Sequence, residues 1–136
     1  MKKLLGLGIA FLIVIIVFTV SVKMSVEKND YLKRTDAVFQ SNLSRLCNNL
    51  NQDESEEANQ ENEKYAYVCF SIFSLTSFSE NEEMNKIVHI LYDLSEKKQL
   101  YDELGIDTID DLNKLCQDMQ NDMLIKKIIT SIGSIN

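Results

Sequence analysis

Residues 4–22 read LLGLGIAFLIVIIVFTVSV, a run of 19 positions without a charged side chain. As an α-helix this run rises about 28 Å, which is close to the roughly 30 Å hydrocarbon thickness of a bilayer. Such a helix is unfavourable in water, because all of its faces are apolar. We therefore predict an N-terminal transmembrane helix, a membrane anchor, over residues 1–23. The anchor residues are Leu4, Leu5, Ile9, Phe11, Leu12, Ile13, Val14, Ile15, Ile16, Val17 and Phe18.

Two features favour an uncleaved signal-anchor over a signal peptide. The apolar run is longer than the 7–15 residues of a typical signal-peptide core, although Lys2 and Lys3 supply a positive start. The best site for a signal peptidase, residues 19–21, is a poor match to the small residues that the enzyme prefers. A cleaved segment remains the alternative, and the protein would then be secreted.

The orientation of the anchor rests on two opposing signals. Basic residues after the run, among them Lys23 and Arg34, favour a cytoplasmic domain under the positive-inside rule. A two-lysine start followed at once by the apolar run is typical of exported segments. We expect a single-pass protein of the cell membrane with an extracytoplasmic domain. Gly6 and Ala10 form a small-residue pair that could allow anchors to self-associate.

Composition favours an all-α fold and excludes one class of partner. The 136 residues include no proline, which turn-rich β folds normally need. Without Lys2 and Lys3, 12 basic and 21 acidic side chains remain, a net charge of −9. Because nucleic-acid binding requires clustered positive charge, we expect no nucleic-acid partner.

Residues 24–136 predict a small antiparallel bundle of about four helices. Apolar residues at helical spacing mark a first helix that ends near residue 50, with no breaker between it and the anchor. An acidic, solvated connection follows at 51–62, and a second helix spans 63–78. Ser79 with Glu82 predicts a capping box for a third helix that closes at Gly105. A fourth helix, with Thr108 and Asp111 as a weaker capping box, continues to residue 132.

The residues needed for common catalytic and cofactor chemistry are scarce. Three cysteines and His89 match the ligand types of a structural zinc site, but each lies in a different predicted helix, without C-x-x-C spacing. No nucleophile motif or phosphate-binding loop occurs. We expect no enzyme, no metal and no cofactor. Cys47 and Cys69 flank the acidic connection and could form a disulfide in an oxidising compartment, although buried free thiols are the simpler expectation.

These observations lead to two hypotheses about function. The first is a non-enzymatic, membrane-anchored helical protein that binds another protein as an accessory component of a membrane complex. The second is a secreted or tethered module that binds a ligand in an apolar pocket lined by aromatic residues. The first hypothesis rests on the anchor, the helical stripes and the missing catalytic groups. The second rests on an unusually aromatic stretch, whose members would line the pocket or form an exposed ligand or partner surface: Tyr65, Tyr67, Phe70, Phe73 and Phe78.

Overall fold

The protein is all-α, with six helices and no strand among the residues that the structure describes. The computed structural model describes residues 2–52 and 54–133, and the side chains from residue 13 onward within these ranges. The helices are α1 (Lys2–Leu50), α2 (Glu56–Phe73), α3 (Glu82–Glu96), α4 (Leu100–Glu103), α5 (Ile106–Gln117) and α6 (Asp122–Ile132). The all-α prediction is confirmed, but the bundle has more helices than expected.

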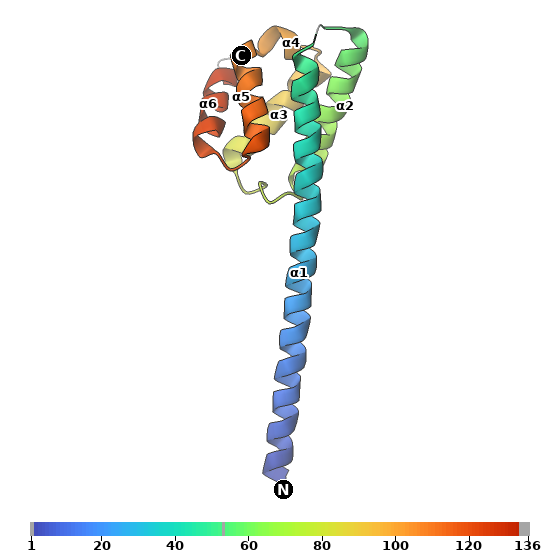
Figure 1. The fold of residues 1–136 in the computed structure, drawn as a ribbon, viewed down its shortest axis with the longest axis vertical. Coiled ribbons are helices and arrows are strands. Elements are labelled where there is room, and N and C mark those ends of the chain that lie inside the picture. Colours follow the sequence, from blue (N-terminus) through green and yellow to red (C-terminus); the bar gives the residue numbers. More distant parts are fainter. Residues whose placement is uncertain (1, 53, 134–136) are drawn as a thin grey trace.

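The first helix is one uninterrupted rod. It has 49 residues, or about 74 Å at the usual rise, and its N-terminal part projects away from the bundle (Figure 1). Its C-terminal part carries a stripe at spacings of three and four residues that is buried in the bundle: Phe39, Leu43, Leu46, Cys47 and Leu50. The absence of glycine and proline between the two parts explains why the helix does not break.

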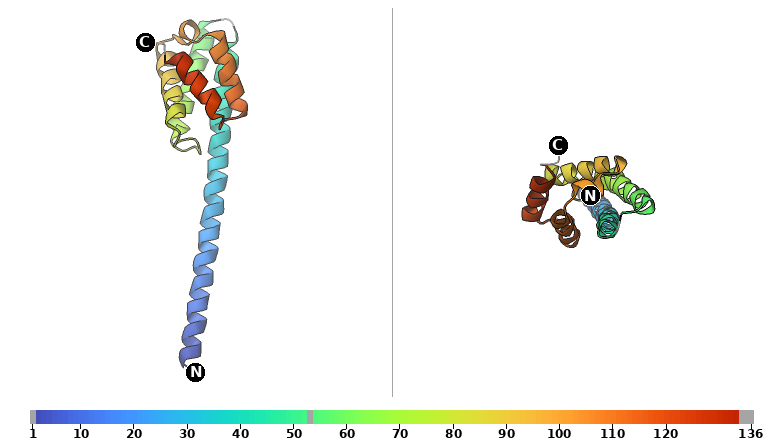
Figure 2. Two further views of the ribbon diagram at one scale, coloured as in Figure 1. Left: turned by 90° about the vertical axis from the view of Figure 1, so that its left-hand side faces the viewer. Right: turned by 90° about the horizontal axis from the view of Figure 1, so that it is seen from above.

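Five helices, α1 among them, form a closed ring, and the stripe of α1 faces the inside of this ring. The pairs in contact are α1 with α2, α2 with α3, α3 with α6, α6 with α5, and α5 with α1, while the short α4 follows α3 (Figures 1 and 2). Helices that are neighbours in the ring run in opposite directions, except for α3 and α6, which run in the same direction. Each of these five helices therefore packs against two neighbours. The core they share includes Met84, Ile87, Leu112, Leu115, Ile125 and Ile128.

The α2–α3 loop is fixed against α1 where the rod meets the bundle. Asp36 of α1 accepts hydrogen bonds from the Ser77 backbone N–H at 2.8 Å and from the Ser77 hydroxyl at 2.6 Å. Beside this contact, the Phe39 ring packs against Phe73 and Phe78, with centroids 5.7 and 6.1 Å apart. Polar and aromatic contacts together hold the loop on the rod.

The acidic connection is shorter than predicted. Helix α2 begins at Glu56, so most of residues 51–62 is helical. The Ser55 hydroxyl accepts a hydrogen bond from the Ala58 N–H, and Glu56 and Glu57 occupy the positive first turn. This capping makes a polar segment helical without an apolar stripe.

The third helix begins and ends at residues other than those predicted. Asn81, not Ser79, is the N-cap, and its side chain accepts a hydrogen bond from the Met84 N–H at 2.9 Å. The helix ends at Glu96, before Gly105, because Lys98 adopts a left-handed conformation with φ of 56°. The Gln99 N–H then donates to the Leu94 carbonyl at 2.9 Å, which closes a Schellman motif.

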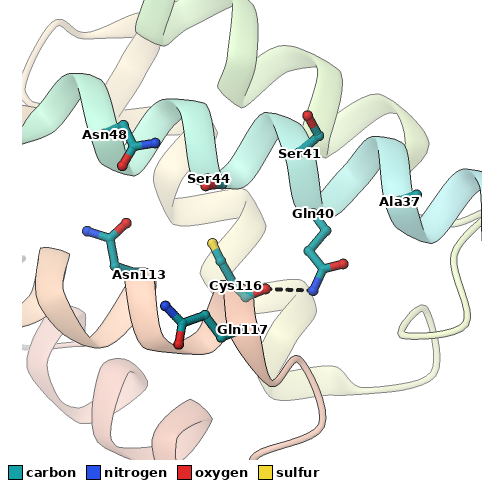
Figure 3. A pocket seen from close by; sticks show the side chains of 8 residues that line it. All are labelled: Ala37, Gln40, Ser41, Ser44, Asn48, Asn113, Cys116 and Gln117. Atoms are coloured by element: carbon teal, nitrogen blue, oxygen red, sulfur yellow. Dashed lines mark hydrogen bonds between the residues drawn. The ribbon is translucent and has the colours of Figure 1, made fainter.

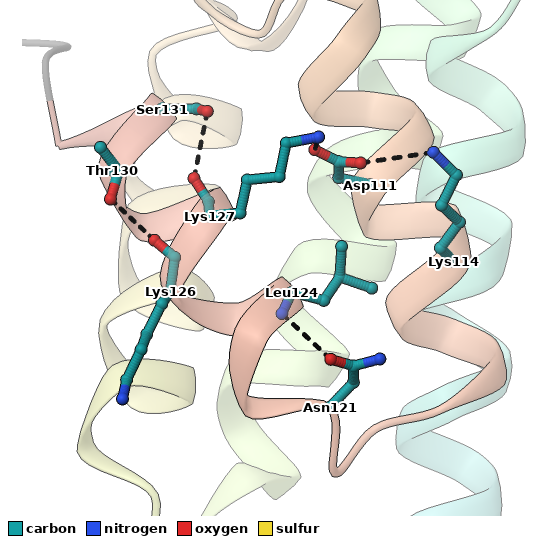
Figure 4. Close-up of polar contacts among 8 residues, drawn as sticks. All are labelled: Asp111, Lys114, Asn121, Leu124, Lys126, Lys127, Thr130 and Ser131. Atoms are coloured by element: carbon teal, nitrogen blue, oxygen red, sulfur yellow. Dashed lines mark hydrogen bonds and ion pairs between the residues drawn. The ribbon is translucent and has the colours of Figure 1, made fainter.

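The predicted fourth helix is two helices, α5 and α6. Asn121 caps α6 by accepting a hydrogen bond from the Leu124 N–H, and α5 has no side-chain cap. Asp111 therefore does not form a capping box with Thr108. Its side chain is 4% exposed and binds Lys127 of α6 at 2.5 Å and Lys114 at 3.4 Å (Figure 4). The bridge with Lys127 joins α5 to α6, and its hydrogen bond lowers the pKa of Asp111.

The predicted membrane anchor is not confirmed. Among the residues described, no helix has a stretch long and apolar enough to cross a membrane. The side chains of Leu4, Leu5, Ile9, Phe11 and Leu12 lie outside the described ones. The other predicted anchor residues, Ile13 to Phe18, are all exposed.

Replacing Asp111 by Asn should destabilise the bundle in a pH-dependent way. We expect the melting temperature to fall by about 5–10 °C at neutral pH, because two charge-assisted contacts are lost. Since the folded state lowers the pKa of Asp111, its contribution is complete above the ordinary value of about 4 and is lost as the pH falls through the lower folded value. Melting curves followed by circular dichroism should therefore converge in acid.

Asp110→Asn is the matched control, since Asp110 is an exposed neighbour on the same helix. A control variant that melts as early as Asp111→Asn at neutral pH would contradict the assignment to the buried bridge.

Candidate functional site

An aromatic cluster lies on the outer surface where α2 packs against α3. We call Tyr67, Phe70, His89 and Tyr92 the aromatic face. The rings of Phe70 and Tyr92 are stacked with centroids 4.6 Å apart, and His89 meets Phe70 edge-on at 4.8 Å. Tyr67 lies 6.3 Å from Tyr92 and is 56% exposed. Phe70 packs against the core, and Tyr67 and His89 are exposed, so the aromatic face leaves ring surface open to solvent.

Local spacing and antiparallel packing together create this face. Tyr67 and Phe70 are three residues apart on α2, and His89 and Tyr92 are three apart on α3, so each pair shares one side of its helix. The adjacent sides, about 100° around each helix, carry the core residues Ala66, Cys69, Val88 and Leu91. Packing α2 on α3 then brings the two aromatic pairs into contact.

Two carboxylates, those of Glu63 and Glu96, lie beside the aromatic rings. The Tyr92 hydroxyl donates a hydrogen bond to Glu96 at 2.6 Å, which raises the pKa of Tyr92 to about 12. Tyr92 therefore remains a neutral donor at any physiological pH. A hollow of about 320 Å³ lies beside the two tyrosines and is also lined by Gln60, Glu63 and Lys64. Rings next to carboxylates are a favourable setting for a cationic side chain.

The predicted aromatic residues do not gather in one place. Phe73 is in the core with 4% exposure, and Phe78 is half-buried against Phe39. Tyr65 is half-buried, with the Arg45 guanidinium 6.0 Å from its ring centre. Only Tyr67 and Phe70 of the predicted surface belong to the aromatic face. The sequence prediction missed His89 and Tyr92, whose i, i+3 spacing beside an apolar stripe was the available signal.

The three cysteines are free thiols buried in the core. The structure does not join Cys47 to Cys69, and the thiol of Cys47 interacts with that of Cys116 instead. This hydrogen bond, with burial, raises the pKa of Cys47, and burial raises that of Cys69 to about 12. The Cys69 thiol also donates to the Phe39 carbonyl at 3.7 Å. Thiols protonated in this way are poor nucleophiles.

No arrangement suited to metal binding occurs in the described part of the chain, where no three His, Cys, Asp or Glu side chains cluster as ligands. His89 packs on Phe70 and is separate from the cysteines.

Comparison with known proteins adds no family to this description. No protein-family model matches the chain, and no curated protein or solved structure matches it either.

Replacing Glu96 by Gln should lower the pKa of Tyr92 from about 12 toward the ordinary value of about 10. The reason is that the carboxylate favours the protonated phenol by accepting its hydrogen bond and by repelling the phenolate. A pH titration of carbon-13-labelled tyrosine by NMR measures the change, with Tyr92→Phe to assign the signal.

Asp93→Asn is the matched control, because Asp93 is an exposed acid on the same helix that does not perturb Tyr92. An equal shift in both variants would mean that general surface charge, not the hydrogen bond, sets the pKa.

Proposed function

We propose that this protein is a non-enzymatic, single-pass membrane protein whose helical bundle binds another protein through the aromatic face. The observation that carries the proposal is the continuity of α1. One helix includes both the uncharged run at 4–22 and the buried stripe at the centre of the bundle. A membrane that contains the N-terminal part of this helix would therefore also fix the position of the bundle.

The exposed apolar side chains of α1 support the membrane anchor. Ile13, Val17 and Phe18 are 55%, 59% and 68% exposed, and they point away from the helix on several sides. The bundle covers none of them, so an external apolar environment is needed to bury them. A bilayer suits the run because the run is apolar on all faces and about 28 Å long.

The geometry of α1 would then set the position of the bundle. Residues 23–35 separate the uncharged run from Asp36, where the bundle begins, and they rise about 20 Å as a helix. They include Lys23 and Glu27, an exposed i, i+4 pair 3.9 Å apart. A rigid helical stalk of this length would hold the aromatic face at a constant height above the membrane, on its extracytoplasmic side.

The aromatic face is suited to a partner with basic side chains. Tyr67 and Tyr92 present ring surface, and Glu63 and Glu96 lie beside them with negative charge. Arginine and lysine bind both to ring faces and to carboxylates. The net charge of −7 would add long-range attraction for a basic partner.

Topology is tested by expressing the full chain with a C-terminal tag, isolating membranes and measuring intact mass. We expect a full-length mass in the membrane fraction and digestion of the bundle when intact cells are treated with protease. A mass shorter by about 21 residues would replace the anchor by a cleaved signal and the protein by a secreted one. Full-length protein that is digested only after lysis would place the bundle in the cytoplasm.

Partner binding is tested by purifying the full chain in mild detergent and identifying the proteins that accompany it. Tyr67→Ala and Tyr92→Ala should each reduce recovery of the partner about tenfold, as loss of an aromatic contact at an interface does. Tyr31→Ala is the matched control, because Tyr31 is a 52% exposed tyrosine on the stalk. Recovery of this chain alone, self-associated or not, would count against the proposal.

A further inference from the structure

A groove runs between α1 and α5, on a different seam of the ring from the aromatic face. The two antiparallel helices flank an open groove of about 530 Å³ (Figure 3). Its polar lining consists of four carboxamides and two hydroxyls: Gln40, Ser41, Ser44, Asn48, Asn113 and Gln117. In a chain with 26% charged residues, no charged side chain lines this groove.

Most of these polar side chains have no partner within the described structure. The Gln40 amide donates to the Cys116 carbonyl at 2.6 Å and ties the two helices together (Figure 3). The side chains of the other five make no hydrogen bond to any described residue. Of these five lining residues, Ser44 and Asn113 are partly buried, whereas Ser41, Asn48 and Gln117 are exposed at the mouth of the groove. The groove therefore presents a set of free donors and acceptors.

The chemistry of the lining selects among ligands. A carboxamide carries one acceptor and one donor group, which is the same pair that a peptide group offers. A charged ligand would find no counter-charge here and would lose hydration on entering. Sugars are usually held against aromatic rings, and no aromatic side chain lines this groove. A neutral chain of peptide groups is the better match.

The dimensions of the groove agree with a short peptide. Its lining on α1 extends from Ala37 to Asn48, which is about 17 Å along the helix axis. An extended chain covers this length in about five residues. The short side chains of Ala37, Ser41 and Ser44 allow a peptide backbone to approach α1 closely. A helix would be a poorer occupant, because its own hydrogen bonds leave the carboxamides unpaired.

We propose that the α1–α5 groove binds an extended, uncharged peptide segment of about five residues, with Asn48 and Asn113 hydrogen-bonded to its backbone. This site goes beyond the function proposed above and shares no residue with the aromatic face. Failure of either proposal therefore leaves the other intact.

The test is selection of phage-displayed random hexapeptides on the full-length chain in detergent micelles, followed by calorimetric titration of the enriched peptides. We expect uncharged sequences to be enriched. Asn48→Ala and Asn113→Ala should each weaken binding about tenfold, which corresponds to one lost hydrogen bond to a buried peptide group. Ser41→Trp should abolish binding, because the indole fills the groove.

Asn85→Ala is the matched control, since Asn85 is an exposed asparagine on α3. It should bind the peptides as the native chain does, and circular dichroism melts establish that all variants are folded. Three results would overturn the proposal: no enrichment over Ser41→Trp, enriched peptides whose affinity is unchanged in both Asn variants, or enrichment of charged peptides only. Binding of a neutral oligosaccharide in place of the peptides would also overturn it.

Discussion

Burial of the α1 stripe from Phe39 to Leu50 is the interaction on which the rest of the structure depends. Each ring neighbour of α1, namely α2 and α5, packs against this segment, and α3 and α6 complete the ring behind the same core. Phe39 is fully buried and contacts Phe73 and Phe78, so it also positions the α2–α3 loop. The bundle is thus assembled around the C-terminal part of α1, and the orientation of α1 fixes the orientation of the bundle.

This arrangement leaves two seams of the ring with different chemistry. The seam between α2 and α3 carries aromatic rings and carboxylates, whereas the seam between α1 and α5 carries neutral amides and hydroxyls. The difference follows from the size of the side chains at each seam. Large rings fill the first seam and project from it, and short side chains such as Ser41 and Ser44 leave the second one hollow.

Buried polar groups show how the fold accommodates its few departures from an apolar core. Asp111 is stabilised by two lysines whose charged ends reach solvent. Each of the two ion pairs is therefore only partly desolvated. The thiols of Cys47 and Cys69 are protonated and behave as small apolar side chains. Asn62 is the exception, because its carboxamide is 1% exposed and has no hydrogen-bond partner in the described structure. Such a group is destabilising relative to an apolar side chain of similar size.

Local properties of the sequence determined the helical class, the continuity of α1, the stripe that is buried and the shared side of Tyr67 and Phe70. These features depend on the spacing of residues within a few helical turns and on the absence of proline, and both can be read directly from the sequence. Only the tertiary structure decided that His89 and Tyr92 complete the aromatic face, that Cys47 lies beside Cys116, and that Asp111 binds Lys127 instead of capping α5. It also decided that α3 ends at Glu96, before the left-handed Lys98, and that α6 begins after Asn121, where neither glycine nor proline marks a boundary. These features depend on which helices meet, and that is set by closing one core from segments far apart in the chain.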